Sequence, residues 1–462
     1  MAGRVKVCLI LEGSYPYITG GVSSWVHQLI GELEDIDFML FTISPAADQA
    51  VHYELADNVV AHHDLVLSQP RSLKKRAPDK KLLLKIKSIH DYLFAGSIPD
   101  ISALIKEIPE GHSLYSEAMG SAAAWEMITS RSQLKNPAYP FADYFWAWKS
   151  AHDMIFTVLA DALPAADIYH AVSTGYAGLV AINAKIRLDK PFILTEHGLY
   201  HKEREMEIRK TPFIRGYQRD MWINIYNTLS RMCYRYADLI IALFEHNRRL
   251  QLELGAPEQK TRVIPNGIDT ASFMVKREKR EGFHVGLIGR VVPIKDIKTF
   301  ISMARIISDD IPEVCFYCIG PTDEDEAYYE NCKILVKSLR LEEKFKFTGR
   351  QNVLEYYSFL DVLLLTSVRE AQPLVILEAY CAGVPVVSTR VGNVPELMDF
   401  DDRFIAPPKD ALQLAKGVSY IYKHQAEMEG LIEKNRERIL SFYERKSLHQ
   451  AYRDIYHEYG VS

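Results

Sequence analysis

The second half of the chain repeats short apolar runs of strand length, with helix-length segments between them. The runs lie at residues 284–288, 314–320, 345–348, 362–366 and 384–388. A continuous apolar run is typical of a strand buried on both faces, and consecutive parallel strands need a crossover helix between them. The sequence therefore predicts an α/β domain with a doubly wound parallel sheet.

The first half of the chain shows the same alternation at both ends but loses it in the middle. Strand-like runs lie at residues 5–11, 38–43, 168–172, 192–195 and 238–244. Between residues 66 and 166 the pattern is helical, with segments around residues 82–94, 116–130 and 142–163. We therefore expect a second α/β domain that carries a helical insertion.

The length of 462 residues predicts two domains, because a single hydrophobic core stops growing at roughly 250–300 residues. The turn signal Asn266-Gly267 marks their junction. We expect a first domain at residues 1–265 and a second at residues 266–440. A final helix within residues 441–462 is expected to pack back on the first domain.

The composition argues against several functional classes. A net charge of −5 lacks the basic excess of a nucleic-acid binder. The apolar runs fall far short of the roughly 18 residues that a membrane span needs, and no secretory signal opens the chain. We therefore expect a cytoplasmic protein that is peripheral to a membrane at most.

Two further patterns favour structural interpretations. The basic run Arg71–Arg76, continued by Lys80 and Lys81, favours a solvated helix end over a contact with anionic lipid or an acidic partner, and both readings stay open. Cys315 and Cys318 match C-x-x-C, but they lie inside a strand-like run, where residues three apart face opposite sides. No second pair or nearby histidine completes a zinc set, so we expect buried strand cysteines.

The segment from Glu370 to Val387 places two carboxylates around a helix start. Pro373 suits the first helical position, so Glu370 precedes the helix and Glu378 lies in its second turn. The unpaired N–H groups of a helix start attract phosphate. A diphosphate flanked by two hydroxyl-rich rings, as in a nucleotide sugar, would match this pattern. Two solvated glutamates are the alternative interpretation.

Two cations follow the first strand of the second domain. Arg290 ends the strand and Lys295 lies in the loop after it, where both could hold a diphosphate and neutralise it as it leaves. In the first domain, Gly20-Gly21 between a strand and an amphipathic helix is a weak phosphate signal. His197 follows a strand at the edge where ligands gather in parallel sheets, and its position fits a structural role equally well.

Together these features resemble the GT-B glycosyltransferases of family GT4, which are retaining enzymes that use nucleotide sugars. The features are Gly20-Gly21, His197, Pro265–Asp269, Gly289-Arg290 with Lys295, and Glu370 with Glu378. More narrowly, residues 11–30, 195–200 and 370–374 resemble the PelF family, the cytoplasmic glycosyltransferases of Pel exopolysaccharide synthesis. The resemblance covers nearly the whole chain. It implies a GT-B fold with two Rossmann-like doubly wound domains facing a central cleft.

The resemblance also implies residue roles. Arg290 and Lys295 would contact the donor diphosphate, Glu370 and His197 the transferred sugar, and Glu378 the ribose. The catalytic set is Arg290, Lys295, Glu370 and His197, and the donor-binding set adds Gly20, Gly21, Arg350, Ala371, Gln372, Pro373, Leu374, Val375 and Glu378. The sequence departs from the family's pattern at two places, which affects the expected geometry of the two loops. Asp296 lies where many relatives have glycine after the lysine. Gln372 and Pro373 replace the glycine often found after the first glutamate.

The implied activity is that of a retaining, metal-independent hexosyltransferase that moves a sugar from a UDP-sugar to a growing Pel-type exopolysaccharide. No cofactor and no metal are expected. The implied partners are UDP or a UDP-sugar, a polysaccharide acceptor and inner-membrane proteins of the Pel export complex, and not nucleic acid. Two alternatives stay open: a sugar-nucleotide epimerase or hydrolase of the same fold, and a non-catalytic scaffold subunit of an export complex.

Overall fold

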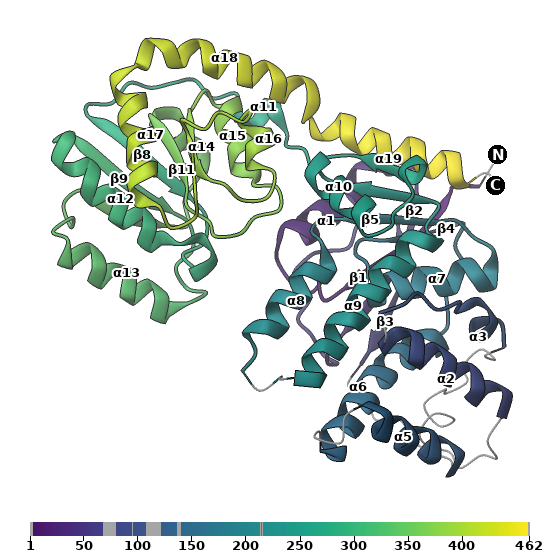
Figure 1. Ribbon diagram of the computed structural model, residues 1–462. Coiled ribbons are helices and arrows are strands. Elements are labelled where there is room, and N and C mark those ends of the chain that lie inside the picture. The colour runs from purple at the N-terminus through teal and green to yellow at the C-terminus, as the bar shows by residue number, and fades with distance from the viewer. Residues whose placement is uncertain are drawn as a thin grey trace. The chain divides into compact units, whose positions relative to one another are not determined.

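The structure is a computed structural model that describes residues 3–67, 80–94, 96–107, 122–135, 140–212, 214 and 216–460. The chain divides into two compact units (Figure 1). Residues Met1–Ile264 and His449–Ser462 form the first unit, and residues Pro265–Leu448 form the second. The predicted basic run Arg71–Arg76 lies outside the described residues.

The sheet of the first unit has, within the described part of the chain, seven parallel strands in the order β3-β2-β1-β4-β5-β6-β7. The strands are β1 Lys6–Glu12, β2 Asp37–Ser44, β3 Val59–Val66, β4 Ile168–Ala171, β5 Phe192–Glu196, β6 Leu239–Ala242 and β7 Thr261–Val263. Residues Val7 to Leu11 of β1 are completely buried, which is typical of a parallel sheet covered on both faces. β3 was not predicted, because its exposed His62 and partly buried Asp64 interrupt the apolar pattern.

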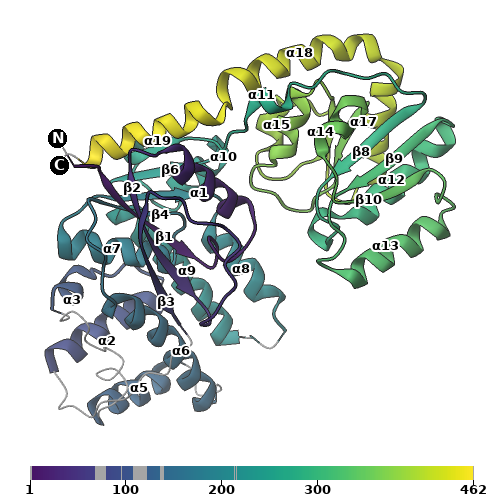
Figure 2. The ribbon, with the colours of Figure 1, turned by 180° about the vertical axis from the view of Figure 1, so that it is seen from behind.

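Helices follow most strands of the first unit. They are α1 Gly21–Glu32, α7 Tyr176–Leu188, α8 Tyr200–Lys210, α9 Gly216–Tyr236 and α10 Glu245–Glu253. The final helix, α19 Arg445–Gly460, lies beside this sheet in both ribbon views (Figures 1 and 2). The Tyr456 hydroxyl hydrogen-bonds with His170 Nδ1 on β4 at 2.7 Å, and both residues are completely buried. Most of α19 therefore belongs to the first unit.

The insertion consists of helices that lie together beyond β3 (Figure 2). They are α2 Lys80–Phe94, α3 Ser102–Glu107, α5 Ala122–Lys135 and α6 Phe141–Ala160. Ile86, Ile105 and Trp148 of these helices share one buried core with Ile10 and Phe41 of the sheet. The insertion is therefore packed into the first unit and is not a separate domain.

The sheet of the second unit has, among the described residues, six parallel strands in the order β10-β9-β8-β11-β12-β13. The strands are β8 Phe283–Ile288, β9 Val314–Ile319, β10 Phe345–Gly349, β11 Val362–Leu365, β12 Val386–Thr389 and β13 Ile405–Ala406. The helices are α11 Thr270–Phe273, α12 Ile297–Asp310, α13 Glu326–Ser338, α14 Val353–Phe359, α15 Leu374–Cys381, α16 Val394–Leu397, α17 Ala411–Lys423 and α18 Gln425–Phe442. Val285, Phe316 and Leu364 are buried in its core.

The two cysteines of the C-x-x-C pattern lie in β9. Cys318 is buried, and burial raises the pKa of its thiol. Cys315 is only partly buried, because it belongs to the alternate residues of β9 that are partly exposed. The prediction of buried strand cysteines is therefore correct for Cys318 and wrong for Cys315.

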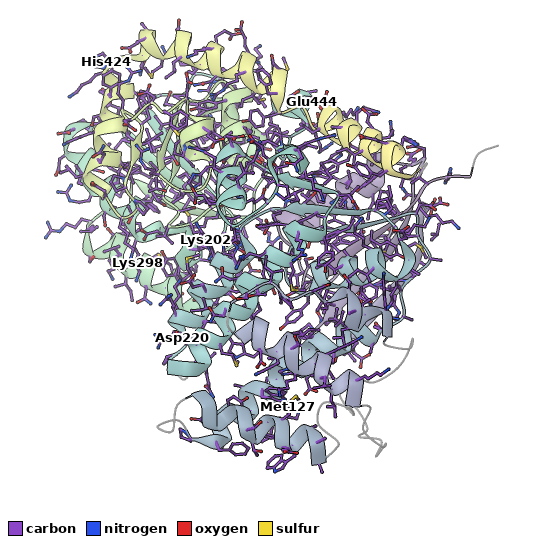
Figure 3. All side chains as sticks on the ribbon, turned by 45° about the vertical axis from the view of Figure 1, so that its right-hand side comes forward. Met127, Lys202, Asp220, Lys298, His424 and Glu444 are labelled. Atoms are coloured by element: carbon purple, nitrogen blue, oxygen red, sulfur yellow. The ribbon has the colours of Figure 1, made fainter. Side chains whose placement is uncertain are left out.

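The chain enters the second unit between Ile264 and Pro265 and leaves it between Leu448 and His449. The Ile268 amide donates to the Tyr443 carbonyl at 3.0 Å, and the Arg445 amide donates to the Ile268 carbonyl at 2.9 Å. Glu444, labelled in Figure 3, lies between α18 and α19 and accepts from the Thr270 amide at 3.2 Å. Because of these bonds, residues 443–445 belong to the second unit, which ends at Leu448. The predicted end of the second domain was residue 440.

Candidate active site

The order of strands in the second sheet brings two loops together. From β8 the chain builds β9 and β10 on one side, and then returns to build β11, β12 and β13 on the other. Loops that leave neighbouring parallel strands at such a switch point form a crevice at the carboxyl edge of the sheet. The loop after β8 carries Arg290 and Lys295, and the loop after β11 carries Glu370.

The loop after β8 is fixed against the end of β11. It contains a short 3-10 helix, Pro293–Lys295. The Thr366 hydroxyl donates to the Lys295 carbonyl at 2.7 Å, and the Val368 amide donates to the Ile294 carbonyl at 2.9 Å. These two bonds hold the backbone of Lys295 beside the loop that carries Glu370.

Lys295 and Glu370 form a direct ion pair. Lys295 Nζ donates to Glu370 Oε1 at 2.6 Å, and the Ser367 hydroxyl donates to the same oxygen at 2.7 Å. Both charged side chains are 17% exposed, so the pair is largely shielded from water. Within the described residues, no other group bonds to the carboxylate, so Oε2 keeps its full capacity to accept.

The backbone of the Glu370 loop is held from the side of β12. The Asn393 amide donates to the Ala371 carbonyl at 3.0 Å. Gly392 has φ +51°, and a Cβ there would lie 2.2 Å from the Ala371 carbonyl oxygen. Glycine is therefore required at position 392, because a side chain would push the Glu370 loop out of place.

Helix α15 begins directly after this loop. Pro373 is its N-cap residue, although it was predicted to occupy the first helical position, and its side chain makes no capping hydrogen bond. The amides of the first turn lack intrahelical acceptors and carry partial positive charge. Leu374 and Val375, whose amides were predicted to approach phosphate, are the first two residues of the helix.

Glu378 lies in the second turn of α15 and is partly buried. The hydroxyl of Tyr357 on α14 donates to Glu378 Oε2 at 2.9 Å. Burial raises the pKa of Glu378 to about 6, although this hydrogen bond acts in the opposite direction. Glu378 is therefore mainly ionised at pH 7 and becomes protonated in mild acid.

Arg290, Asp296 and Arg350 lie in the loops after β8 and β10, and the described structure gives none of them a hydrogen bond or ion pair with Glu370. Arg290 pairs with Glu324, which follows β9, at 2.6 Å, and both side chains are about half exposed. Asp296 has φ +48°, in the left-handed region that favours glycine and tolerates aspartate. Asp296 therefore adopts a backbone conformation in which glycine is the most readily accommodated residue. Arg350 follows the edge strand β10 and is exposed.

The predicted residues of the first unit lie near its own switch point, which is between β1 and β4. Gly20 and Gly21 are exposed at the start of α1, which no side chain caps, and a Cβ at either position would meet open space. His197 follows β5 and packs on Trp25 of α1, with 4.5 Å between the ring centres. The structure therefore joins His197 to the helix that Gly20 and Gly21 begin.

His197 is buried, and its Nε2 has no hydrogen-bond partner among the described residues. Burial lowers the pKa of His197 to about 4, so the imidazole is neutral at pH 7. A buried ring nitrogen without a partner is unfavourable by itself. This nitrogen is therefore suited to form a hydrogen bond with a bound molecule.

Two carboxylates of the first unit were not predicted, the buried Glu196 and the partly buried Glu12. Glu196, the last residue of β5, accepts from the Tyr234 hydroxyl at 2.6 Å and from Gln251 Nε2 at 2.9 Å. Glu12, the last residue of β1, accepts from the Tyr200 hydroxyl at 2.7 Å. Burial raises the pKa of both, that of Glu196 to about 7. Each carboxylate directly ends an apolar run, which is the sequence signal that could have identified them.

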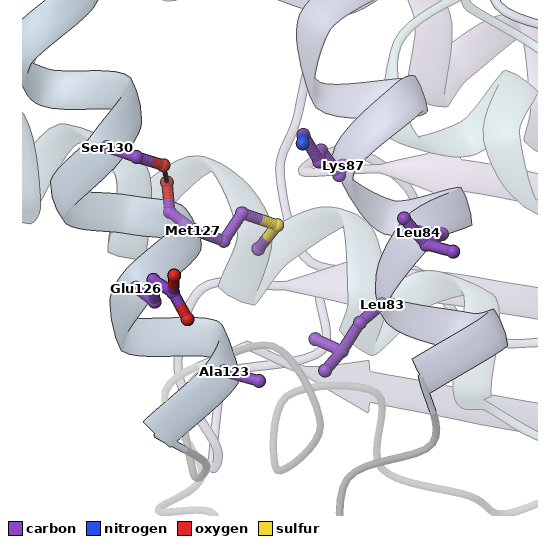
Figure 4. Close-up of a pocket in the computed structure, with 7 residues that line it drawn as sticks. All are labelled: Leu83, Leu84, Lys87, Ala123, Glu126, Met127 and Ser130. Carbon is purple, nitrogen blue, oxygen red and sulfur yellow. Dashed lines mark hydrogen bonds between the residues drawn. The ribbon is translucent and has the colours of Figure 1, made fainter.

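A separate hollow of about 350 Å³ lies between α2 and α5 of the insertion (Figure 4). Its lining residues are Leu83, Leu84 and Lys87 from α2, with Ala123, Glu126, Met127 and Ser130 from α5. None of the predicted site residues lines it. In the described residues, no cluster of three or more His, Cys, Asp or Glu side chains could hold a metal ion, and no helix is long and apolar enough to span a membrane.

Comparison with known proteins identifies the family. Residues 5–259, more than half of the chain, match the family model described as a domain of unknown function, DUF3492. The chain belongs to the DUF3492 family. Residues 282–424 of this DUF3492 protein also match the family model for glycosyl transferases group 1. The second match covers most of the second unit, including every site residue assigned to that unit.

Curated relatives match about half of the DUF3492 chain. N-acetyl-alpha-D-glucosaminyl L-malate synthase of Bacillus anthracis is 26% identical over 248 residues, which are 50% of this chain and 62% of the relative. Alpha-maltose-1-phosphate synthase of Mycobacterium tuberculosis is 26% identical over 260 residues, which are 52% and 64%. The chain thus spans less than two thirds of the length of these curated relatives.

Solved structures match almost the whole DUF3492 chain. Anabaena HepE in complex with UDP gives a TM-score of 0.62 at 16% identity and covers 98% of this chain and 99% of that one. Sucrose-phosphate synthase of Thermosynechococcus elongatus gives 0.61 at 16% identity, also with 98% and 99% coverage. The two Rossmann-like sheets and these neighbours confirm the predicted GT-B fold.

Proposed function

We propose that this DUF3492 protein is a retaining glycosyltransferase that moves a hexose from a UDP-sugar to a growing exopolysaccharide of the Pel type. The observation that carries the proposal is the pairing of Lys295 with Glu370 at the switch point of the second sheet, beside the uncapped start of α15. The group 1 glycosyltransferase match over residues 282–424 supports it. So does HepE, a GT-B neighbour solved in complexes with UDP and with UDP-glucose.

The diphosphate is the part of the donor that this site suits best. When the bond between the sugar C1 and the diphosphate oxygen breaks, its electron pair stays on that oxygen. Lys295, Arg290 and the first-turn amides of α15 would stabilise this charge, each such donor being worth about 3 kcal/mol. The proposal needs no metal, and it predicts that a chelator leaves the initial rate unchanged.

The carboxylates would hold the two sugar rings. Glu370, oriented by Lys295 and Ser367, has Oε2 available for a hydroxyl of the transferred sugar. Glu378, held by Tyr357, would accept from the ribose hydroxyls. The neutral His197 would offer Nε2 to the transferred sugar from the first unit.

Retention of configuration requires that the new bond form on the face that the diphosphate leaves. In the proposed step the acceptor hydroxyl attacks C1 as the diphosphate departs, and its proton passes to the departing phosphate oxygen. Atoms and charges balance without a protein nucleophile. Proton NMR of the first-formed product determines the anomeric configuration of the new linkage. A configuration opposite to that of the sugar in the donor would contradict this step.

An acceptor-dependence assay separates this function from its rivals. UDP release from a UDP-sugar is measured with and without an exopolysaccharide acceptor, in the wild type and in Lys295→Ala, Arg290→Ala and Glu378→Ala. The proposal predicts release that depends on the acceptor and falls at least tenfold in the variants. Equal release without acceptor would indicate a hydrolase or a hydrolysing epimerase. Conversion of the donor without UDP release would indicate an epimerase, and no conversion of any donor would indicate a scaffold.

The proposed setting is the cytoplasmic face of the inner membrane, reached through partner proteins of a Pel-type export complex. Lysines of α2, including the exposed Lys81, are the described end of the predicted basic run. Reversal of the charges in residues 71–87 with unchanged membrane fractionation would exclude a direct contact of this run with the membrane.

A further inference from the structure

Gln372 forms a two-point contact with a distant part of the chain. Its Nε2 donates to the Asn266 carbonyl at 2.8 Å, and the Asn266 amide donates to its Oε1 at 2.9 Å. The side chain is only 8% exposed. Burying an amide is unfavourable unless its hydrogen bonds are made, and here both ends of the amide are used. The side-chain amide of Gln372 therefore bonds to both backbone groups of Asn266, as the backbone of a neighbouring strand does.

Asn266 lies two residues after the chain enters the second unit, in a segment with little freedom. At the adjacent Gly267 a Cβ would lie 2.8 Å from Arg445 Cα and 2.8 Å from the Tyr443 carbonyl oxygen. Ile268 exchanges backbone hydrogen bonds with Tyr443 and Arg445. The entering and the returning segments of the chain are thus joined next to Asn266.

The other end of the contact is the loop that carries Glu370. Lys295 and Ser367 bind the carboxylate of Glu370, and the Asn393 amide binds the Ala371 carbonyl. Gln372 is the next residue and directly precedes Pro373, the N-cap of α15. Gln372 therefore joins the linker at Asn266 to the loop by two hydrogen bonds. The joined position lies between Glu370, the carboxylate proposed to contact the sugar, and the start of α15, proposed to face the phosphate.

We propose that Gln372 is a positioning residue that couples the linker at Asn266 to the Glu370 loop, so that the linker conformation sets the place of Glu370. The catalytic part of this inference rests on the proposed function, since it takes Glu370 as the group that contacts the donor sugar. The coupling itself rests only on the hydrogen bonds of Gln372.

Two substitutions separate this role from packing. Gln372→Glu keeps the shape but sets a carboxylate oxygen against the Asn266 carbonyl, while Gln372→Met keeps the volume and removes both hydrogen bonds. Gln413→Glu, on the exposed start of α17, makes the same chemical change away from the loop and serves as the control.

Hydrogen–deuterium exchange without nucleotide tests the coupling. In Gln372→Met we expect at least tenfold faster exchange at the hydrogen-bonded amides of the linker segment, Asn266 and Ile268, and of the segment after Glu370, where the Ile376 amide donates to the Pro373 carbonyl. Faster exchange in only one of these two segments, or in neither, overturns the coupling. This readout is independent of the proposed function, because no donor is present.

Steady-state kinetics test the consequence for catalysis. Gln372→Glu is expected to lower kcat at least tenfold near pH 7.5 while the dissociation constant of UDP changes less than twofold. Relative to the wild type at each pH, its kcat should recover as the pH falls toward about 5, because burial raises the pKa of the new carboxyl and its protonated form can again donate to the Asn266 carbonyl. A parallel loss of UDP binding, or no recovery, overturns the positioning role. A wild type without transferase activity instead refutes the proposed function and leaves the exchange result to decide the coupling.

Discussion

Arg290 and Lys295 leave the same strand, but they have different partners. Lys295 is largely shielded and paired with Glu370, whereas Arg290 is half exposed and paired with Glu324. Exposed ion pairs are worth roughly 0–1 kcal/mol, so a diphosphate could readily displace Glu324 from Arg290. Lys295 is therefore already paired with Glu370, whereas Arg290 would be recruited by a bound donor.

Glu324→Gln should therefore strengthen the binding of UDP. Because Arg290 no longer has to leave a carboxylate, the affinity is expected to rise by up to about fivefold, the equivalent of about 1 kcal/mol. Isothermal titration calorimetry measures it, with Glu330→Gln as the control, since Glu330 forms a similar exposed pair with Lys333. If neither Glu324→Gln nor Arg290→Ala changes the affinity for UDP, Arg290 does not bind the diphosphate.

Glu378 should make donor binding dependent on pH. Its pKa of about 6 means that the carboxylate is lost as the pH falls below 6. The affinity for UDP-glucose should then fall by up to about tenfold per pH unit, whereas Glu378→Gln should bind weakly and without this slope. Calorimetry between pH 5 and 7.5 with UDP-glucose checks it, because this diphosphate diester has no titration in that range. A wild-type slope that persists in Glu378→Gln would assign the effect to another group.

The places of several candidate site residues in the fold could be predicted from sequence, because a strand end or a helix start lies beside each of them. Glu370 and Glu378 flank a helix start, and Lys295 follows a strand, so their common edge of the sheet could be inferred. The partners Glu324 and Asn266 could not be predicted. Each lies in a different loop from the residue it contacts, and only the folded chain brings Arg290 to Glu324 and Gln372 to Asn266.

Among the elements, β5 shows how a buried carboxylate supports a candidate site residue. Glu196 ends β5, directly before His197, and its carboxylate accepts from Tyr234, Gln251 and Thr174. The turn that carries His197 is therefore fixed from the interior. The buried charge is unfavourable, which is why the pKa of Glu196 rises.

Glu196→Gln should flatten the dependence of stability on pH. The folded-state pKa of about 7 exceeds the ordinary value of 4.5. The stability linked to the proton is therefore complete below pH 4.5 and is lost as the pH rises through 7, by about 3 kcal/mol at most. Urea denaturation at pH 5.5 and pH 8 measures it. If the variant loses as much stability as the wild type between these values, Glu196 is not the group responsible.

The elements that sequence analysis identified are those with uniform apolar patterns, such as β1, β8 and β11. It missed β3, an edge strand with exposed polar residues, and α18, most of whose residues are exposed or half-exposed. In both cases only one face or a few residues are buried, so the apolar signal is weak. Neighbouring elements, rather than local preference, fix these two segments.

In the whole molecule, the two units are not two consecutive stretches of the chain, because the last residues of the chain belong to the first unit. α19 comes last in the chain, yet His170 and Thr195 of the first sheet bind its buried tyrosines Tyr456 and Tyr452. Both the final helix and its return to the first domain were expected from the sequence. The end of the second unit at Leu448 depends on the backbone bonds between residues 268 and 443–445, which have no local sequence signal.

Tyr456→Phe should destabilise the first unit. It removes the hydrogen bond to His170 Nδ1 inside the core and leaves that nitrogen without this partner, which costs about 1–3 kcal/mol. Urea denaturation checks it, with Tyr459→Phe on the same helix as the control. A stability equal to that of the wild type would show that α19 does not depend on this contact.

We propose that the carboxyl edge of the second sheet, at Lys295 and Glu370, binds the diphosphate of a nucleotide sugar. Calorimetric titration with UDP-glucose of the wild type, Lys295→Ala and the control Gln413→Glu measures this binding. We expect one site per chain in the wild type and the control, and at least tenfold weaker binding in Lys295→Ala. Equal affinity in Lys295→Ala and the wild type would contradict it.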